Sequence, residues 1–183
     1  MSTPLGLKIG NALEVEESVE VLAGGGPADV VEITVELARE MLRLAGKTDV
    51  DVAAALSDGR AMDKWNQMIR AQGGDPAAKL PVAKHSHVIV AQDSGALTKL
   101  DALALGVASW RLGAGRARKE DAVQFGAGIQ MHAQLGDTVV AGQPLLTLFT
   151  DEPERFERAQ EALVGGIEYG ATAPTRKIIL ERL

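Results

Sequence analysis

The chain has 183 residues, 46% hydrophobic and 24% charged, which is ordinary for a globular protein. Its formal net charge of −6 and its lack of cysteine argue against nucleic-acid binding, disulfides, thiolate metal sites and a cysteine nucleophile. The first residues lack the pattern of a signal peptide, and no apolar run approaches the roughly 20 residues of a membrane helix, so we expect a cytoplasmic protein.

The first part of the chain predicts helices. A helix follows the Gly10-Asn11 pair, glycines 24–26 end it, and Pro27 suits the first turn of the next helix. Over residues 27–46 the apolar residues recur at helical spacing, and Gly46 is a natural C-cap. This stripe consists of Val30, Ile33, Leu37, Met41 and Leu44. Two shorter helices are expected over 49–59 and 60–72.

Residues 73–81, GGDPAAKLP, interrupt the helical pattern. We therefore place a helical segment at 1–74, a linker at 75–85 and an α+β domain at 86–183. The fold class is mixed α/β.

Within the α+β domain the sequence predicts strands over 87–92 and near 95–101, and a helix that ends at Gly113. Residues 122–150 alternate apolar and polar residues between glycines, which is typical of several short strands. Residues 151–170 are predicted as a helix, with Asp151 as N-cap and Pro153 in the first turn. A last strand is expected over 176–183. With aromatic residues at only 3%, the core must be aliphatic.

Residues 135–152 follow the hairpin pattern of lipoyl and biotinyl carrier domains, which attach their cofactor to a lysine in an exposed turn. Here Glu152 follows the strand, and a carboxylate cannot be acylated in that way. The sequence therefore favours a hammerhead-type β fold without the attached cofactor. A non-catalytic lipoyl-like binding or interaction module is the alternative function.

Residues 112–121, LGAGRARKED, combine two glycines with Arg116, Arg118 and Lys119. Backbone amides beside a guanidinium can hold a phosphate. The glycines follow a helix and precede a strand, however, which reverses the usual order of a phosphate-binding loop. The pattern therefore favours a helix C-cap followed by a solvated basic turn.

His85 and His87 lie two residues apart on a predicted strand, so both side chains can face the same way. Such a pair can share a metal ion only with a third ligand, and His132 is the one remaining histidine. An ordinary strand edge is the favoured interpretation. Motifs for a serine hydrolase, a Walker loop or a zinc protease are absent from the sequence.

Two segments resemble a known family. Residues 1–27 resemble the middle of thymidine and pyrimidine-nucleoside phosphorylases, and residues 79–150 resemble their C-terminal domain. The motifs GNALEV and LGAGR…KED, in this order, carry the resemblance. It implies a helical remnant of the phosphorylase α/β domain, followed by a C-terminal α/β-hammerhead domain similar to a lipoyl-like barrel.

The resemblance also implies a function. The family transfers a pentosyl group from a pyrimidine nucleoside to phosphate, giving free base and (deoxy)ribose 1-phosphate in pyrimidine nucleoside salvage and catabolism. Its phosphate-binding loop and its pyrimidine-binding residues lie upstream of the matched segments, so no catalytic or substrate-binding residue carries over. We therefore expect this chain to begin inside its protein, to expose an apolar helical face, and to be inactive alone. Family members are homodimers without an organic cofactor, and neither nucleic acid nor membrane is an expected partner.

One family site maps partly onto this chain. Some members hold a monovalent cation, potassium, near the hinge between two domains. By position, its ligands here would be the main-chain carbonyls of Leu5 and Lys8 and the carboxylate of Glu17. Oxygen ligands suit a hard cation. The family more often has a small residue where Lys8 stands, and an exposed helix carboxylate is the alternative role for Glu17.

Overall fold

The computed structural model describes residues 2–181, which group by their contacts into two compact units. Unit 1 comprises Met1–Val15 and Leu80–Arg176, and unit 2 comprises Glu16–Lys79 and Lys177–Leu183. The sequence predicted two consecutive parts, a helical segment at 1–74 and an α+β domain at 86–183. The contacts instead place the first fifteen residues with the α+β domain, because a short N-terminal strand pairs with its sheet.

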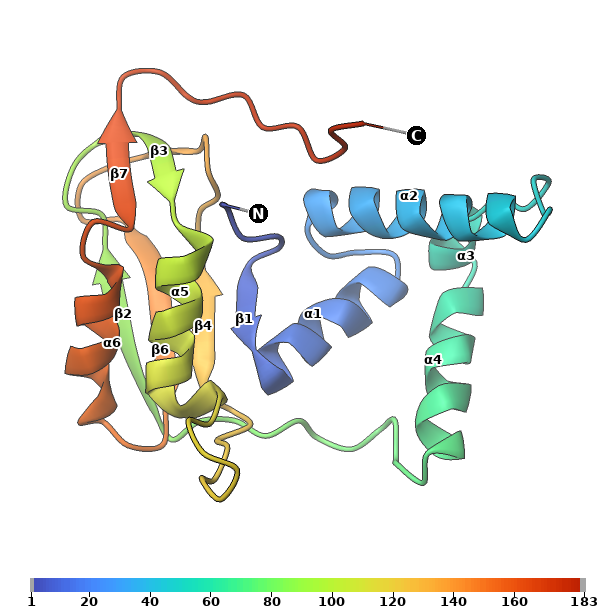
Figure 1. The fold of residues 1–183 in the computed structure, drawn as a ribbon, viewed down its shortest axis with the longest axis horizontal. Helices are drawn as coiled ribbons and strands as arrows, with labels where there is room; N and C mark the ends of the chain where they lie inside the picture. Colours follow the sequence, from blue (N-terminus) through green and yellow to red (C-terminus); the bar gives the residue numbers. More distant parts are fainter. Residues whose placement is uncertain (1, 182–183) are drawn as a thin grey trace. The chain divides into compact units, whose positions relative to one another are not determined.

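Unit 1 contains two antiparallel sheets (Figure 1). Sheet A has the order β1-β4-β6-β2 and sheet B the order β5-β3-β7. The strands of sheet A are β1 (Lys8–Gly10), β4 (Gly128–Met131), β6 (Pro144–Thr150) and β2 (His85–Val90). Those of sheet B are β5 (Thr138–Val139), β3 (Gly95–Leu100) and β7 (Ile167–Gly170).

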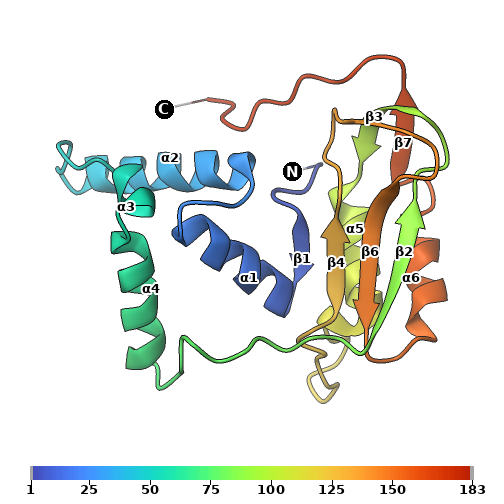
Figure 2. The same ribbon diagram turned by 180° about the vertical axis from the view of Figure 1, so that it is seen from behind.

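Two helices, α5 (Ala102–Ser109) and α6 (Arg155–Leu163), cover one face of sheet A. Figure 2 shows the sheet from the opposite side, with both helices behind its strands. Asp101 caps α5, because its Oδ1 accepts hydrogen bonds from the amides of Leu103 and Ala104. The helix continues into a π-helical turn, η1 (Trp110–Ala114), where Gly113 has a φ of 108°. The predicted helix end at Gly113 is confirmed.

The core of unit 1 is built from sheet A, these two helices and buried residues of sheet B. Its largest fully buried side chains include Leu97, Leu105, Leu112, Ile129 and Leu148. Burial alternates along the second half of β6, as expected for a strand with one covered face. Phenylalanine, tyrosine and tryptophan are absent from the buried core among the described residues, so the predicted aliphatic core is confirmed.

Unit 2 is helical. Its elements are the C-terminal part of α1 (Asn11–Leu22), then α2 (Ala28–Leu44), α3 (Ala54–Ser57) and α4 (Arg60–Ala71). These helices are the four that the sequence predicted. Pro27 occupies the N-cap position of α2, and Gly46 follows its end with a φ of 70°.

The C-terminal part of the apolar stripe of α2 is exposed in this unit, whereas Val30 and Ile33 are half-buried. Leu37, Met41 and Leu44 have relative accessibilities of 57%, 66% and 78%. The same helix buries only Asp29 and Val35. The expectation of an exposed apolar helical face is therefore confirmed, and a face of this kind normally marks an interaction surface.

Three predictions in the C-terminal third are wrong. The predicted helix over 151–170 begins only at Arg155, because Asp151 Oδ1 instead accepts a hydrogen bond from the amide of Lys84 at 3.0 Å. It ends at Leu163, and Ile167–Gly170 forms β7 by pairing with β3. Of the last strand expected over 176–183, residues 176–181 form no strand, and residues 182 and 183 lie outside the described residues.

The predicted hairpin within 135–152 is the third error. β5 pairs with β3 in sheet B, whereas β6 pairs with β2 and β4 in sheet A. The turn between them, at Gly142 with a φ of 85°, carries the chain from one sheet to the other.

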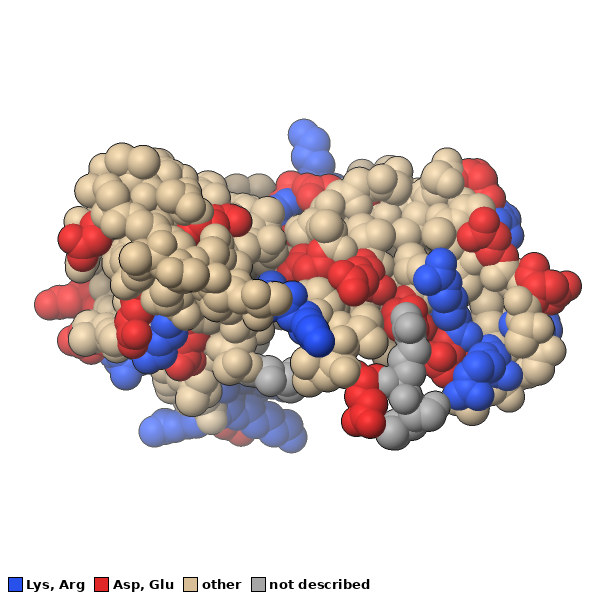
Figure 3. Space-filling model, turned by 90° about the horizontal axis from the view of Figure 1, so that it is seen from above, with Lys and Arg blue, Asp and Glu red and all other residues tan. Residues whose placement is uncertain are grey.

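Charged side chains are mixed on the surface. On the face shown in Figure 3, basic side chains are interspersed with acidic ones and form no continuous basic surface. None of the helices in residues 2–181 combines the length and the apolar character of a membrane-spanning segment.

Candidate functional site

The strand β1 approaches β4 closely through a pair of glycines. Gly10 and Gly128 face each other in the antiparallel register, with φ values of 139° and 155°. A Cβ on Gly10 would lie 2.5 Å from the carbonyl oxygen of Ala127. A Cβ on Gly128 would collide with the carbonyl oxygen of Ile9. Only glycine fits at these two paired positions. Each has a φ that other residues rarely adopt, and a Cβ at either position would meet the backbone of the neighbouring strand segment.

Hydrogen bonds join the start of α1 to the loop after α5. The Asn11 side chain donates from Nδ2 to the carbonyl oxygen of Ala114 at 2.6 Å. The Ala12 amide donates to the carbonyl of Phe125 at 3.0 Å, and Glu14 Oε1 accepts from the Gly10 amide at 2.9 Å. GNALEV and LGAGR, the motifs on which the resemblance rested, are therefore in direct contact.

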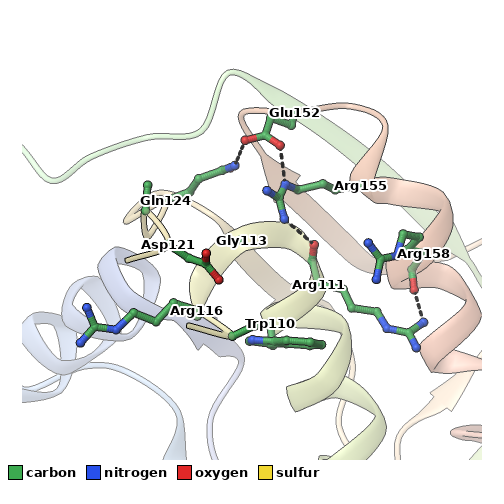
Figure 4. Close-up of a pocket in the computed structure, with 12 residues that line it drawn as sticks. Trp110, Arg111, Gly113, Arg116, Asp121, Gln124, Glu152, Arg155 and Arg158 are labelled. Carbon is green, nitrogen blue, oxygen red and sulfur yellow. Dashed lines mark hydrogen bonds and ion pairs between the residues drawn. The ribbon is translucent and has the colours of Figure 1, made fainter. Parts of the chain in front are cut away.

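The loop that Asn11 holds forms one wall of a cavity of about 370 Å³ (Figure 4). The opposite wall is α6, and Trp110 of η1 lies between the two walls. The charged lining residues are Arg111, Arg116, Arg155, Arg158, Asp121 and Glu152. We call this cavity the arginine pocket.

Gln124 and Glu152 organise the rim of the arginine pocket. Gln124 donates from Nε2 to Glu152 Oε1 at 2.8 Å, and Arg155 donates from Nε to Glu152 Oε2 at 2.7 Å. The hydrogen bond from Arg155 is the main cause that lowers the pKa of Glu152. The positive charge of Arg155 and the hydrogen bond from Gln124 lower this pKa further. Glu152 thus helps to fix the start of α6.

Thr150 connects this rim to the core. Its side chain is fully buried, and its hydroxyl donates to the carbonyl oxygen of Leu112 at 2.7 Å. The hydroxyl also lies 3.1 Å from Gln124 Oε1, which in turn accepts from the Asp151 amide at 2.7 Å. The end of β6, the π-helical turn and the loop therefore share one hydrogen-bond network.

Replacing Thr150 by valine is expected to lower the free energy of unfolding by about 1–3 kcal/mol, because the Leu112 carbonyl loses its buried donor. Thr150→Ser keeps the hydroxyl and should lose less. Urea unfolding followed by circular dichroism measures both variants. A valine variant as stable as the serine variant would show that the hydroxyl contributes nothing.

The histidine pair lies on an edge strand. β2 is an outer strand of sheet A, and both His85 and His87 are exposed. The ring of His87 lies 5.5 Å from that of Phe156, whereas His132 Nε2 is 2.8 Å from Thr147 Oγ1. Within residues 2–181, no group of three histidine or carboxylate side chains is placed to hold a metal ion.

The predicted cation ligands fall in different units. Leu5 is exposed and Lys8 pairs with Gln130 on β4, both in unit 1. Glu17 lies in unit 2 and has only 7% relative accessibility, so it is not an exposed helix carboxylate. The set of Leu5, Lys8 and Glu17 stays a prediction.

Sequence reasoning found the basic turn but missed its partners. Trp110, Gln124, Arg155 and Arg158 were not singled out, although all four line the arginine pocket. The spacing of Arg155 and Arg158 by three residues places them on one face of a helix, which was the available signal. Nothing in the sequence indicated that this face would meet the loop at 113–124.

Comparison with known proteins matches residues 96–170 to the pyrimidine nucleoside phosphorylase C-terminal domain. The chain is 50% identical over 184 residues to thymidine phosphorylase of Mycobacterium tuberculosis (strain ATCC 25618 / H37Rv), covering 100% of this chain and 43% of that protein. It is 37% identical over 190 residues to pyrimidine-nucleoside phosphorylase of Bacillus subtilis (strain 168), covering 98% and 44%. The chain thus spans less than half the length of these curated relatives.

Proposed function

We propose that this chain serves as the C-terminal part of a pyrimidine-nucleoside phosphorylase, since residues 96–170 match the C-terminal domain of that family. The reaction would be pentosyl transfer. An oxygen of phosphate attacks C1′ of the nucleoside, the bond from C1′ to the base breaks, and the products are free base and a pentose 1-phosphate. The observation that carries the proposal is 50% identity to a thymidine phosphorylase over the whole chain.

The role proposed for residues 1–183 is structural support of the closed active site. The family's phosphate loop and base-binding residues have no counterpart in this sequence. The arrangement that favours support is the tight coupling of β1 and α1 to the α+β domain. Gly10, Asn11 and Ala12 each contact the segment from Ala114 to Gly128. These contacts would hold the α+β domain against the first residues of α1.

We further propose the fold and assembly that the family implies. Unit 1 would correspond to the α/β-hammerhead domain, with a lipoyl-like barrel built from its two antiparallel sheets. The exposed apolar stripe of α2 would pack against the central sheet of the complete enzyme. Potassium at Leu5, Lys8 and Glu17, a homodimer and a cytoplasmic location belong to the same proposal.

On this proposal the isolated chain is inactive. Incubated with phosphate and either thymidine or uridine, residues 1–183 should release no free base above a blank without protein. Thymidine phosphorylase of M. tuberculosis, assayed in parallel, is the positive control, and circular dichroism establishes that the isolated chain is folded. Turnover well above the blank would contradict the assignment of all catalytic groups to other parts of the enzyme.

A further inference from the structure

Residues 2–12, which we call the leading segment, include the outer strand β1 of sheet A (Figure 2). Their carbonyl oxygens accept hydrogen bonds from residues far along the chain. The Ser2 carbonyl accepts from the amide of Ala102 at 3.0 Å. The Leu7 carbonyl accepts from the amide of Met131 at 2.7 Å, next to the antiparallel pairing of β1 with β4. Backbone contacts of this kind are how a sheet takes up an additional strand.

Side chains of unit 1 hold the same segment. Arg176 donates from Nη2 to the carbonyl of Pro4 at 2.8 Å. Gln134 donates from Nε2 to the carbonyl of Gly6 at 3.3 Å. Together with the hydrogen bond from Asn11 described above, these contacts are spread along the whole leading segment. The rest of unit 1 therefore recognises the segment at several points and not at β1 alone.

The leading segment also has an apolar side. Leu7 and Ile9 are partly buried and pack against the core of unit 1. They lie two residues apart at the start of β1, so both face the same side of the strand. Leu5, in contrast, is exposed at 46%. The partner that this surface fits is therefore an extended chain with two apolar residues in alternation, followed by a glycine at the position of Gly10.

The leading segment is separated in sequence from the residues that hold it. Between Val15 and Leu80 the chain belongs to unit 2. The connection from α4 to β2, residues 72–84, contains neither helix nor strand, and most of its residues are exposed (Figure 1). The contacts described above all lie outside this connection, so they do not require that it be intact.

We propose that residues 80–176 form a strand-binding surface whose ligand is the leading segment, and that they bind this segment also when it belongs to a separate polypeptide. Backbone pairing gives the affinity. The packing of Leu7 and Ile9 and the close approach at Gly10 give the selectivity. This binding does not depend on the enzymatic role proposed above, because it uses only contacts within unit 1.

Cutting the chain between its two units tests this binding. A recognition site for a sequence-specific protease is inserted between Lys79 and Leu80, where unit 2 gives way to unit 1, and the folded full chain is cleaved. The pieces 1–79 and 80–183 should then elute together in gel filtration without denaturant, at the volume of the uncut chain. Sedimentation velocity over a dilution series gives the Kd of their association.

Ile9→Asp should weaken this association about a hundredfold, because it places a carboxylate against the apolar core. Leu5→Asp makes a similar change at an exposed position of the leading segment, so it is the matched control and should leave the Kd unchanged. Asn11→Ala removes one hydrogen bond and should weaken the association about fivefold. Circular dichroism of each uncut variant establishes that it is folded, and Asn11→Ala decides the test if Ile9→Asp is not.

The residues after Arg176 group with unit 2 and give the pieces a second connection. The cut chain is therefore also measured with a stop codon after Arg176, and we expect its pieces to stay associated. Wild-type pieces that separate on cleavage would overturn the proposal. So would separation caused by the stop after Arg176, equal Kd values for folded Ile9→Asp and Leu5→Asp, or, where Ile9→Asp does not fold, a wild-type Kd for Asn11→Ala.

Discussion

Replacing Gly10 by alanine is expected to lower the free energy of unfolding of unit 1 by about 2–5 kcal/mol. A left-handed backbone costs a non-glycine residue about 1–2 kcal/mol, and overpacking adds about 1–3 kcal/mol. Both terms apply here, since Gly10 has a φ of 139° and its added Cβ would lie 2.5 Å from the carbonyl oxygen of Ala127. That oxygen belongs to the backbone and cannot move aside as a flexible side chain would. Urea unfolding followed by circular dichroism measures the loss.

Gly142→Ala is the matched control for this prediction. Gly142 lies in the same unit with a φ of 85°, and a Cβ added there would meet no atom within 4 Å. Only the backbone cost of about 1–2 kcal/mol should therefore appear. If the two variants lose equal stability, the close approach of β1 to β4 does not constrain Gly10.

The helices of unit 2 could be predicted because local signals define them. Apolar residues at helical spacing, the glycines at 24–26 and Pro27 mark the ends of α1 and α2 without reference to the rest of the chain. The same local reasoning located β2 and β3, whose apolar residues lie between turn signals.

The errors concern elements that depend on distant partners. Ile167–Gly170 is a strand because β3 pairs with it, and the helical pattern that precedes it concealed this change. Residues 176–181 have the composition of a strand but no partner strand among the described residues. β5 and β6 looked like a hairpin, yet each pairs in a different sheet. Strand pairing of this kind is set by tertiary contacts.

The residues of the candidate site also differ in whether local sequence reveals them. Arg116 was found because glycines and basic residues cluster in 112–121. Arg158 was not found, because α6 is more than thirty residues farther along the chain and meets the loop only in the folded unit. Asn11 belongs to GNALEV, the first of the two motifs that carry the resemblance. Its hydrogen bond to the carbonyl of Ala114 gives a physical reason for an asparagine at this position.

A chimera that joins this chain to the rest of a thymidine phosphorylase is expected to be active. We expect residues 1–183 to replace the matching 43% of thymidine phosphorylase of M. tuberculosis without loss of the enzyme's chemistry. The two segments are 50% identical, and the contacts of Gly10 with Ala127 and of Asn11 with Ala114 lie wholly within this chain. The residues that bind phosphate and the base would be supplied by the rest of the enzyme.

The direct measurement is the rate of thymine release from thymidine and phosphate by this chimera. The proposed function predicts a rate within about tenfold of the parent enzyme, which corresponds to about 1.4 kcal/mol in the activation free energy. The same chimera carrying Gly10→Ala should melt at a lower temperature, because the added Cβ would meet the backbone of β4 and the residue before it. A chimera that melts like the parent and releases no thymine above the blank would contradict the assignment of this chain to a pyrimidine-nucleoside phosphorylase.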